Sequence, residues 1–143
     1  MVGPHDIILR LLVAFFLGGV IGSEREKKRR SAGLRTHILV SMGSCLIMLT
    51  SIHIFDIYKG LAVVDPARIA AGVVTGIGFL GGGAILRSGH EIMGLTTAAT
   101  IWISSAIGLA AGCGFFMAAV VTTVLSLITL VVLGRLEKSQ GLK

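Results

Sequence analysis

The chain has 143 residues, of which 54% are hydrophobic, 14% are charged and 6% are aromatic, and its mean hydropathy is +0.92. This composition excludes a disordered chain, which combines low hydrophobicity with high charge, and it falls well short of the charged fraction of ordinary soluble domains. The formal charge of +6 would point to nucleic acid on a soluble surface, so the places where the basic residues occur decide its meaning.

Five apolar stretches predict five transmembrane helices. A span needs about 20 apolar residues to cross a hydrocarbon core about 30 Å thick. Residues 92–134 contain no Asp, Glu, Lys or Arg over 43 positions, which fits two spans separated at residues 112–114. The first stretch is long enough to cross the membrane if the Arg10 side chain extends to the near interface. We therefore expect an all-α integral membrane protein with a single domain. The predicted spans lie near residues 6–23, 37–56, 67–86, 94–112 and 115–134.

The basic residues predict the orientation of these spans. With five spans, ten Lys and Arg residues fall on one side, and only Arg10, Lys59 and Arg68 fall on the other. The side richer in Lys and Arg in its short loops faces the cytoplasm. We expect an outer N-terminus, a basic cytoplasmic loop at 24–36 and a cytoplasmic tail at 135–143. Anionic lipid headgroups are the expected partners of residues 25–35, with another protein as the alternative, and nucleic acid is not expected.

A short internal repeat accompanies the first four spans. The tetrapeptide Phe-Leu-Gly-Gly occurs at 16–19 and again at 79–82, 63 residues later. Each copy is followed by a similar entry to the next span, at 32–36 and at 93–97. We interpret spans one and two, and spans three and four, as two hairpins that run in the same direction, a parallel repeat. A chance match is the alternative.

Small residues predict the faces on which these helices meet. Lipid gives an apolar side chain little reason to prefer a protein neighbour, so membrane helices associate through close packing of small residues. The expected packing or partner positions are Gly18 and Gly22 in the first span, Gly72, Gly76, Gly78 and Gly82 in the third, and Thr96, Thr100, Ser104 and Gly108 in the fourth.

The third span is the richest in small residues, so we expect it at the centre of the bundle. A dimer through Gly72 and Gly76 is predicted. The three consecutive glycines at 81–83 could also break this helix, since each costs a helix about 1 kcal/mol relative to alanine. The alternative to packing is that the small polar residues line a path for ions or water.

The few carboxylates near the outer side carry the metal hypothesis. Asp65 followed by Pro66 is typical of a helix start, with the N-cap and first-turn positions filled by preferred residues. Asp56 and Asp65 flank the same outer loop, and two carboxylates are the usual minimum for Mg²⁺. The sequence contains no pattern typical of a catalytic nucleophile or a phosphate loop. We expect no enzyme activity and no cofactor, with Mg²⁺ as the open alternative.

Five segments together resemble the MgtC/SapB family. They are residues 17–26, 32–37, 65–71, 76–81 and 94–102, and they cover most of the chain in the family's order. The polar motif positions that match are Glu24, Arg25, Arg35, Thr36, His37, Asp65, Arg68, Thr96, Thr97, Thr100 and Trp102. Longer family members add a cytoplasmic C-terminal domain, so this chain resembles their membrane domain alone.

The resemblance implies a function that the spacing of residues alone does not indicate. It implies a bacterial inner-membrane protein linked to Mg²⁺ homeostasis, to growth in low Mg²⁺ and to virulence. It also implies a regulator that acts on other membrane proteins through helix–helix contacts, with the F-type ATP synthase as an expected target. A homo-oligomer, with a dimer favoured, fits that role. The alternative is a transporter or channel for Mg²⁺ or another cation, and a third reading is an assembly component.

Overall fold

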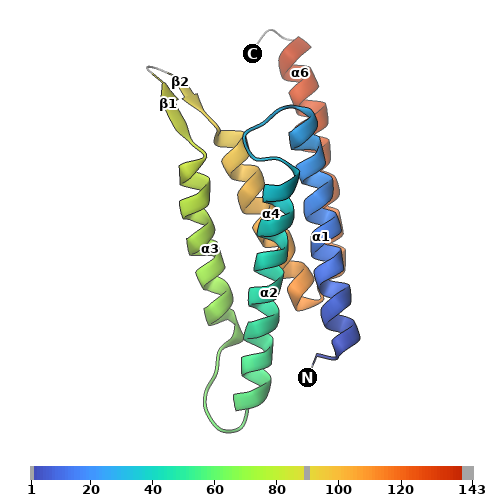
Figure 1. Ribbon diagram of the computed structural model, residues 1–143, viewed down its shortest axis with the longest axis vertical. Coiled ribbons are helices and arrows are strands. Elements are labelled where there is room, and N and C mark those ends of the chain that lie inside the picture. Colours follow the sequence, from blue (N-terminus) through green and yellow to red (C-terminus); the bar gives the residue numbers. More distant parts are fainter. Residues whose placement is uncertain (1, 89–90, 140–143) are drawn as a thin grey trace.

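The computed structural model describes residues 2–88 and 91–139 and consists almost wholly of helices (Figure 1). The elements are α1 (Pro4–Lys27), α2 (Leu34–Tyr58), α3 (Pro66–Gly83), β1 (Leu86–Ser88), β2 (Glu91–Met93), α4 (Leu95–Cys113), α5 (Phe116–Ile128), the π-helix η1 (Thr129–Leu133) and α6 (Gly134–Ser139). The predicted all-α class is confirmed, and the antiparallel pair β1–β2 is a short addition at one end.

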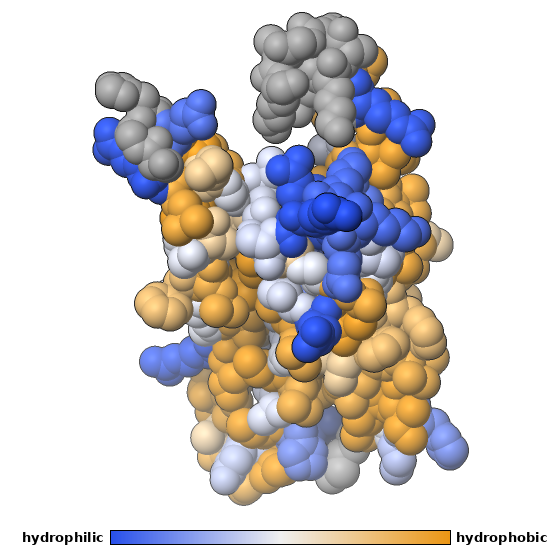
Figure 2. Space-filling view, turned by 45° about the horizontal axis from the view of Figure 1, so that its top comes forward, coloured by the Kyte–Doolittle hydropathy of each residue, from blue (hydrophilic) through white to orange (hydrophobic). Residues whose placement is uncertain are grey.

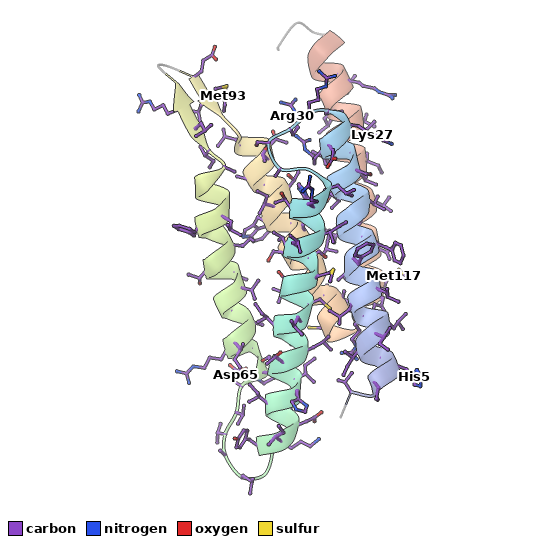
Figure 3. The ribbon with its side chains drawn as sticks, viewed as in Figure 1. His5, Lys27, Arg30, Asp65, Met93 and Met117 are labelled. Carbon is purple, nitrogen blue, oxygen red and sulfur yellow. The ribbon has the colours of Figure 1, made fainter. Side chains whose placement is uncertain are left out.

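The long helices lie along one direction, so the molecule has two distinct ends. Lys27 and Arg30 lie at one end with the β1–β2 hairpin and α6, and we call this the basic end (Figure 3). His5 and Asp65 lie at the opposite end, which we call the N-terminal end.

Local sequence explains where the helices start and stop. Pro66 occupies the first turn of α3, and the Asp65 side chain accepts a hydrogen bond from the Ala67 backbone N–H at 2.9 Å. Helix α4 is bounded by Gly94 and Gly114, which have φ values of +90° and +78°. Such left-handed backbone is accessible to glycine without strain, so these two residues delimit α4, the second at the predicted break.

Helices α2 and α4 form the centre of the bundle. Helix α1 packs against both, α3 packs against both from another side, and α5 covers α4 and α1. The third span was expected at the centre, and the described bundle instead places α3 at its edge. Only Val73, Ile77 and Gly81 of α3 are buried, one residue in four along a single face. Packing therefore follows this narrow apolar stripe, while the remaining glycines of α3 face outwards.

Among the described residues, four helices are long and apolar enough to cross a membrane. They are Pro4–Lys27, Leu34–Tyr58, Leu95–Cys113 and Phe116–Leu136. The sides of the bundle expose large apolar residues, with Phe79 85% exposed, whereas hydrophilic residues gather at the basic end (Figure 2). Apolar side chains on this surface suit contact with lipid. The helices also satisfy their own backbone hydrogen bonds, as a lipid environment requires.

Several boundaries differ from those expected. Helix α1 continues to Lys27 and α2 begins at Leu34, so the connection between them is shorter than 24–36. Residues 81–83 remain helical, and α3 ends with the Ala84 N–H bonded to the carbonyl groups of Leu80 and Gly81. The strands after α3 and the π-helix after α5 were not predicted from the sequence. Residues 140–143 of the predicted tail lie outside the described residues.

Candidate functional site

Two glycines of α1 lie directly against α2. A Cβ atom at Gly18 would lie 2.7 Å from the carbonyl oxygen of His37, and one at Gly22 would lie 2.7 Å from the Cα of Leu34. Real side chains do not approach a backbone so closely, so only glycine allows these two helices to meet at this distance. The spacing of four residues puts both glycines on one face of α1.

Two glycines of α4 lie against α2 in the same way. A Cβ atom at Gly108 would overlap the carbonyl oxygen of Ser41, and one at Gly112 would lie 2.8 Å from the carbonyl oxygen of Cys45. Ser104 is fully buried one turn before Gly108. Gly108 and Gly112 therefore lie where α4 meets α2, whereas Thr96, predicted for the same row, is exposed.

The glycines of α3 are placed differently. A Cβ atom at five of the six glycines would find no atom within 4 Å apart from the neighbouring backbone of its own helix. Apart from Gly83 at the last position of the helix, these are Gly72, Gly76, Gly78 and Gly82. We call them the open face of α3, since α3 uses Val73, Ile77 and Gly81 to pack against its neighbours.

A cluster of polar side chains is buried among α1, α2 and α4 towards the basic end. We call it the polar core and define it by Arg25, His37, Ser41 and Ser104. Arg25 is 3% exposed, and the other three are fully buried. A cationic side chain at this depth is costly unless it is paired or hydrogen-bonded, which makes the cluster a candidate functional site.

The polar core holds four atoms without a hydrogen-bond partner among the described residues. They are Arg25 Nε, His37 Nε2, Ser41 Oγ and Ser104 Oγ. His37 donates from Nδ1 to the carbonyl oxygen of Gly33 at 2.8 Å, so Nε2 of the neutral ring is an acceptor. These atoms are a donor from Arg25, an acceptor from His37 and two hydroxyl groups, each of them buried.

Hydroxyl groups continue the buried polarity along the α2–α4 contact. The Ser44 and Ser105 hydroxyl oxygens lie 3.1 Å apart, and Ser44 also donates to the Val40 carbonyl oxygen at 2.8 Å. Ser44 has a single hydroxyl proton, so Ser105 supplies the proton between the two side chains. The Thr100 hydroxyl donates to the carbonyl oxygen of Thr97 in its own helix at 2.8 Å, and both threonines are buried.

Carboxylates surround the polar core at the basic end. Glu24 pairs with the Lys28 ammonium group at 2.7 Å and with the Arg25 guanidinium group at 3.4 Å. Glu26 accepts a hydrogen bond from the Leu34 backbone N–H at 2.7 Å, which places a negative charge at the start of α2. The positive end of the helix dipole favours that charge. The two carboxylates thus neutralise cations and cap a helix.

The two carboxylates considered for Mg²⁺ have local roles. Asp56 forms an ion pair with Lys59 at 2.8 Å, and Asp65 caps the start of α3. Within the part of the chain that the structure describes, no group of three or more His, Cys, Asp or Glu side chains is placed to hold a metal ion. The buried charge of the polar core belongs to Arg25, and a cation there opposes the approach of Mg²⁺.

Most of the chain matches one protein family. Residues 11–139 match the MgtC family. The chain belongs to the MgtC family. YhiD of Escherichia coli strain K12, which bears the name "Putative magnesium transporter", is 45% identical over 133 residues, 92% of this chain and 62% of YhiD. Protein MgtC of Salmonella typhimurium strain LT2 is 45% identical over 120 residues, 84% of this chain and 49% of that protein.

The family and the four spanning helices identify a multi-pass protein of the bacterial inner membrane. An uncharacterized protein of Haemophilus influenzae is also 44% identical, over 89% of this chain and 56% of its own length. The chain therefore spans about half to three fifths of the length of these curated relatives. No solved structure matches it.

The MgtC motif positions are not gathered at one site. Glu24, Arg25 and His37 lie in or beside the polar core, together with buried Thr97 and Thr100. Asp65 lies at the opposite end (Figure 3). The exposed positions are Arg35, Arg68, Thr96 and Trp102, and Thr36 is half-buried.

Three features of this MgtC family chain were not anticipated from its sequence. Arg25 was expected at the membrane edge, yet its side chain is buried. Arg10 was expected to extend to the interface, and it donates instead to the Gly112 carbonyl oxygen at the end of α4, at 2.7 Å. Ser105 was not singled out, although its neighbour Ser104 was. The one signal for Ser105 is that it directly follows Ser104, and both serines are buried.

Proposed function

We propose that this chain is a non-enzymatic membrane protein related to Mg²⁺ that regulates other membrane proteins through helix–helix contacts. The observation that carries the proposal is the open face of α3, where four glycines have no neighbour within 4 Å. In lipid, glycine gains nothing over alanine and weakens the helix by about 1 kcal/mol. Its benefit is close approach of another backbone, which is what the glycines of α1 and α4 provide.

The magnesium connection rests on the relatives. The name of YhiD refers to magnesium transport, and the family is MgtC. A role in low-Mg²⁺ adaptation fits both, and a role in virulence follows from the same resemblance. The F-type ATP synthase is the first partner to test, by comparing ATP hydrolysis in membrane vesicles with and without this protein.

We also propose that α3 is a fifth span and that the N-terminus lies outside. Helix α3 runs alongside α2 and α4 in the bundle, which supports its crossing with them (Figure 1). Five crossings put the basic end, with its short loops rich in Lys and Arg, on the cytoplasmic side. Reporter fusions at the α2–α3 loop and at α6 would test this, and equal reporter activity at both positions would contradict it.

A parallel repeat of two hairpins is supported by equivalent contacts. In the first hairpin Gly18 faces the His37 carbonyl group, and in the second Gly81 faces the Ala98 carbonyl group, at 3.9 Å from the Cβ position. His37 and Ala98 occupy matching places, four residues after the glycines that precede α2 and α4. His37 and Ala98 are 61 residues apart, and so are Ser44 and Ser105. Ser44 and Ser105 also contact each other, as equivalent residues beside a pseudo-twofold axis do.

A dimer experiment tests the open face. Changing Gly72 and Gly76 together to leucine should lower the mass of the protein in nanodiscs from that of a dimer to that of a monomer, because leucine prevents close backbone approach. Gly43→Leu is the matched control, since Gly43 also has no neighbour within 4 Å but lies on α2. Cells that carry the α3 variant should grow poorly at low Mg²⁺, whereas cells that carry the Gly43→Leu control should grow normally. Equal behaviour of both would reject this face.

A cation path is the second candidate function. The name of the relative YhiD, "Putative magnesium transporter", favours it, although the buried positive charge of Arg25 in the polar core opposes a cation there. Purified protein in liposomes should then carry Mg²⁺, and Asp65→Asn should reduce the flux if the carboxylate charge is needed. Asparagine also caps helices, so this change separates charge from capping. Absence of flux in the wild type would leave the regulator proposal in place.

A further inference from the structure

A cavity of about 690 Å³ lies at the basic end between α1, the start of α4 and the η1–α6 segment. Five of its lining side chains are basic and one is a carboxylate. They are Arg25, Lys27, Lys28, Arg30, Arg135 and Glu24. In Figure 2 the hydrophilic surface of this end lies directly above the apolar sides of the bundle.

The charges of this basic cavity are unevenly paired. Glu24 is held by Lys28 at 2.7 Å and by Arg25 at 3.4 Å, so its negative charge is matched within the cavity wall. Lys28 also donates to the Leu130 carbonyl oxygen at 2.8 Å, which fixes the end of α1 to the π-helix. Lys27, Arg30 and Arg135 are exposed and add three positive charges to the lining. An anion is therefore favoured there.

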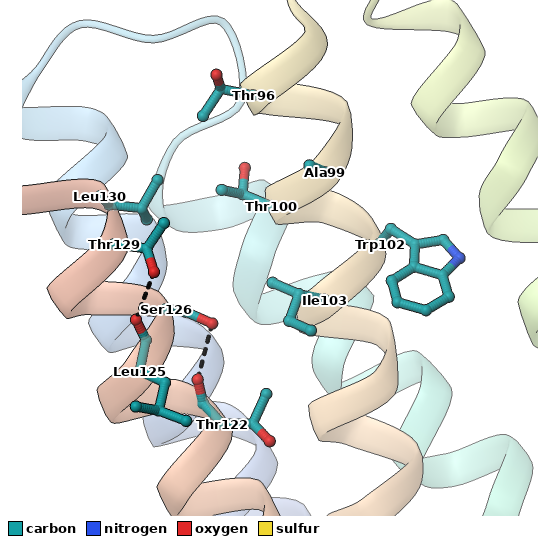
Figure 4. Close-up of a pocket in the computed structure, with 10 residues that line it drawn as sticks. All are labelled: Thr96, Ala99, Thr100, Trp102, Ile103, Thr122, Leu125, Ser126, Thr129 and Leu130. Atoms are coloured by element: carbon teal, nitrogen blue, oxygen red, sulfur yellow. Dashed lines mark hydrogen bonds between the residues drawn. The ribbon is translucent and has the colours of Figure 1, made fainter. Parts of the chain in front are cut away.

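A second hollow continues from the basic cavity into the membrane-facing side. It is a groove of about 590 Å³ between α4 and α5, and it shares Thr96, Thr129 and Leu130 with the basic cavity. Ser126 and Thr129 donate to the carbonyl groups of Thr122 and Leu125 in their own helix (Figure 4). These hydroxyl groups are thus satisfied internally, and the groove offers an apolar wall.

We propose that the basic cavity and the groove together bind one anionic phospholipid. Its phosphate would lie among Lys27, Arg30 and Arg135, and an acyl chain would lie along the α4–α5 groove. A free anion would use the cavity but not the groove, whereas a zwitterionic lipid would use the groove but gain little from the excess positive charge. Basic pockets between membrane helices at the cytoplasmic side commonly hold anionic headgroups. Helix α3 lines neither hollow, so this site is independent of the open face.

The charge arm of the test uses native mass spectrometry of the full chain with dioleoyl phosphatidylglycerol, dioleoyl phosphatidylcholine or inorganic phosphate. Phosphatidylglycerol should bind one per chain and at least about tenfold more tightly than phosphatidylcholine. Arg30→Gln with Arg135→Gln should weaken phosphatidylglycerol binding roughly 30-fold, from about 1 kcal/mol per basic residue. Arg29→Gln with Arg35→Gln removes the same charge outside the cavity and should have little effect. Equal losses in the two double variants would overturn the proposal.

The groove arm tests the acyl chain. Ser126 points into the groove, so Ser126→Phe should fill it and weaken binding of phosphatidylglycerol at least tenfold. Val124→Phe is the matched control, because Val124 lies on the exposed side of α5 outside the groove and should leave binding unchanged. Displacement of the lipid by millimolar inorganic phosphate, or unchanged binding in Ser126→Phe, would assign the cavity to a free anion and overturn the lipid proposal.

Discussion

Helices α4 and α3 use the same residue type for different purposes. Glycines of α4 lie so close to α2 that a Cβ atom at Gly108 would overlap a backbone oxygen. Glycines of α3, such as Gly72 and Gly76, have no neighbour within 4 Å. Spacing along the sequence is alike in the two helices, so the difference lies in what surrounds them. A small-residue face is used within the chain in one case and left open in the other.

Helices α4 and α3 also differ in where their hydroxyl groups lie. Helix α4 carries Ser104 and Ser105 into the buried contact with α2, whereas the one hydroxyl group of α3 belongs to exposed Thr75, which donates to the Ala71 carbonyl group of its own helix. The interior of the bundle is therefore held by close backbones and hydroxyl groups. The edge helix α3 exposes four glycines and large apolar side chains such as Phe79 to its surroundings.

The largest expected effect is from one substitution made in both helices. Gly108→Ala should lower the free energy of unfolding by about 3 kcal/mol, because its methyl group meets the rigid backbone of α2. In the monomer, Gly72→Ala should cause no loss, and a gain of up to about 1 kcal/mol, because alanine favours the helix. Thermal unfolding in detergent, followed by circular dichroism, would measure both. If Gly72→Ala destabilised as much as Gly108→Ala, the contrast would fail.

A smaller effect is expected at the N-terminal end. Arg10→Met should cost about 1–2 kcal/mol, because it removes a charge-assisted hydrogen bond to the Gly112 carbonyl group while keeping an unbranched side chain. Arg68→Met on α3 is the control, since Arg68 is exposed. Chemical denaturation in detergent micelles would compare them. A loss in Arg68→Met that matched the loss in Arg10→Met would show that α3 is held as firmly as α4.

The smallest expected effect is the coupling between the two central hydroxyl groups. A double-mutant cycle of Ser44→Ala and Ser105→Ala should give a coupling energy of about 0.6 kcal/mol, the mean for hydrogen bonds between membrane helices. The same cycle with Thr75→Ala in place of Ser105→Ala should give none. A coupling energy indistinguishable from zero for the serine pair would exclude their hydrogen bond as a contributor to stability.

Much of this fold could be predicted from the sequence, because apolar length and helix punctuation are local properties. Uncharged runs indicated the long helices, Asp65 with Pro66 marked the start of α3, and the glycines at 112 and 114 marked the end of α4. Which helix occupies the centre of the bundle is not a local property of its sequence. It depends on the shapes of several helices at once, and counting the small residues of α3 does not say whether any neighbour lies beside them.

The candidate site was less predictable for the same reason. The motif positions Glu24, Arg25 and His37 were singled out, but the burial of Arg25 and His37 depends on how α1, α2 and α4 pack together. The basic cavity needs the π-helix, whose wider turn has no simple sequence signal. Strands β1 and β2 are only three residues each, too short for a pattern of alternation to establish.

The two polar contacts of α1 set the order in which the protein can be completed in the membrane. Arg10 reaches Gly112 and Lys28 reaches Leu130, and each contact spans 102 residues of sequence. The first helix therefore finds its two acceptors in segments that are synthesised much later, at the end of α4 and in the π-helix. A nascent chain shorter than 130 residues holds α1 without one of these contacts, so the bundle closes fully only after Leu130 has been synthesised.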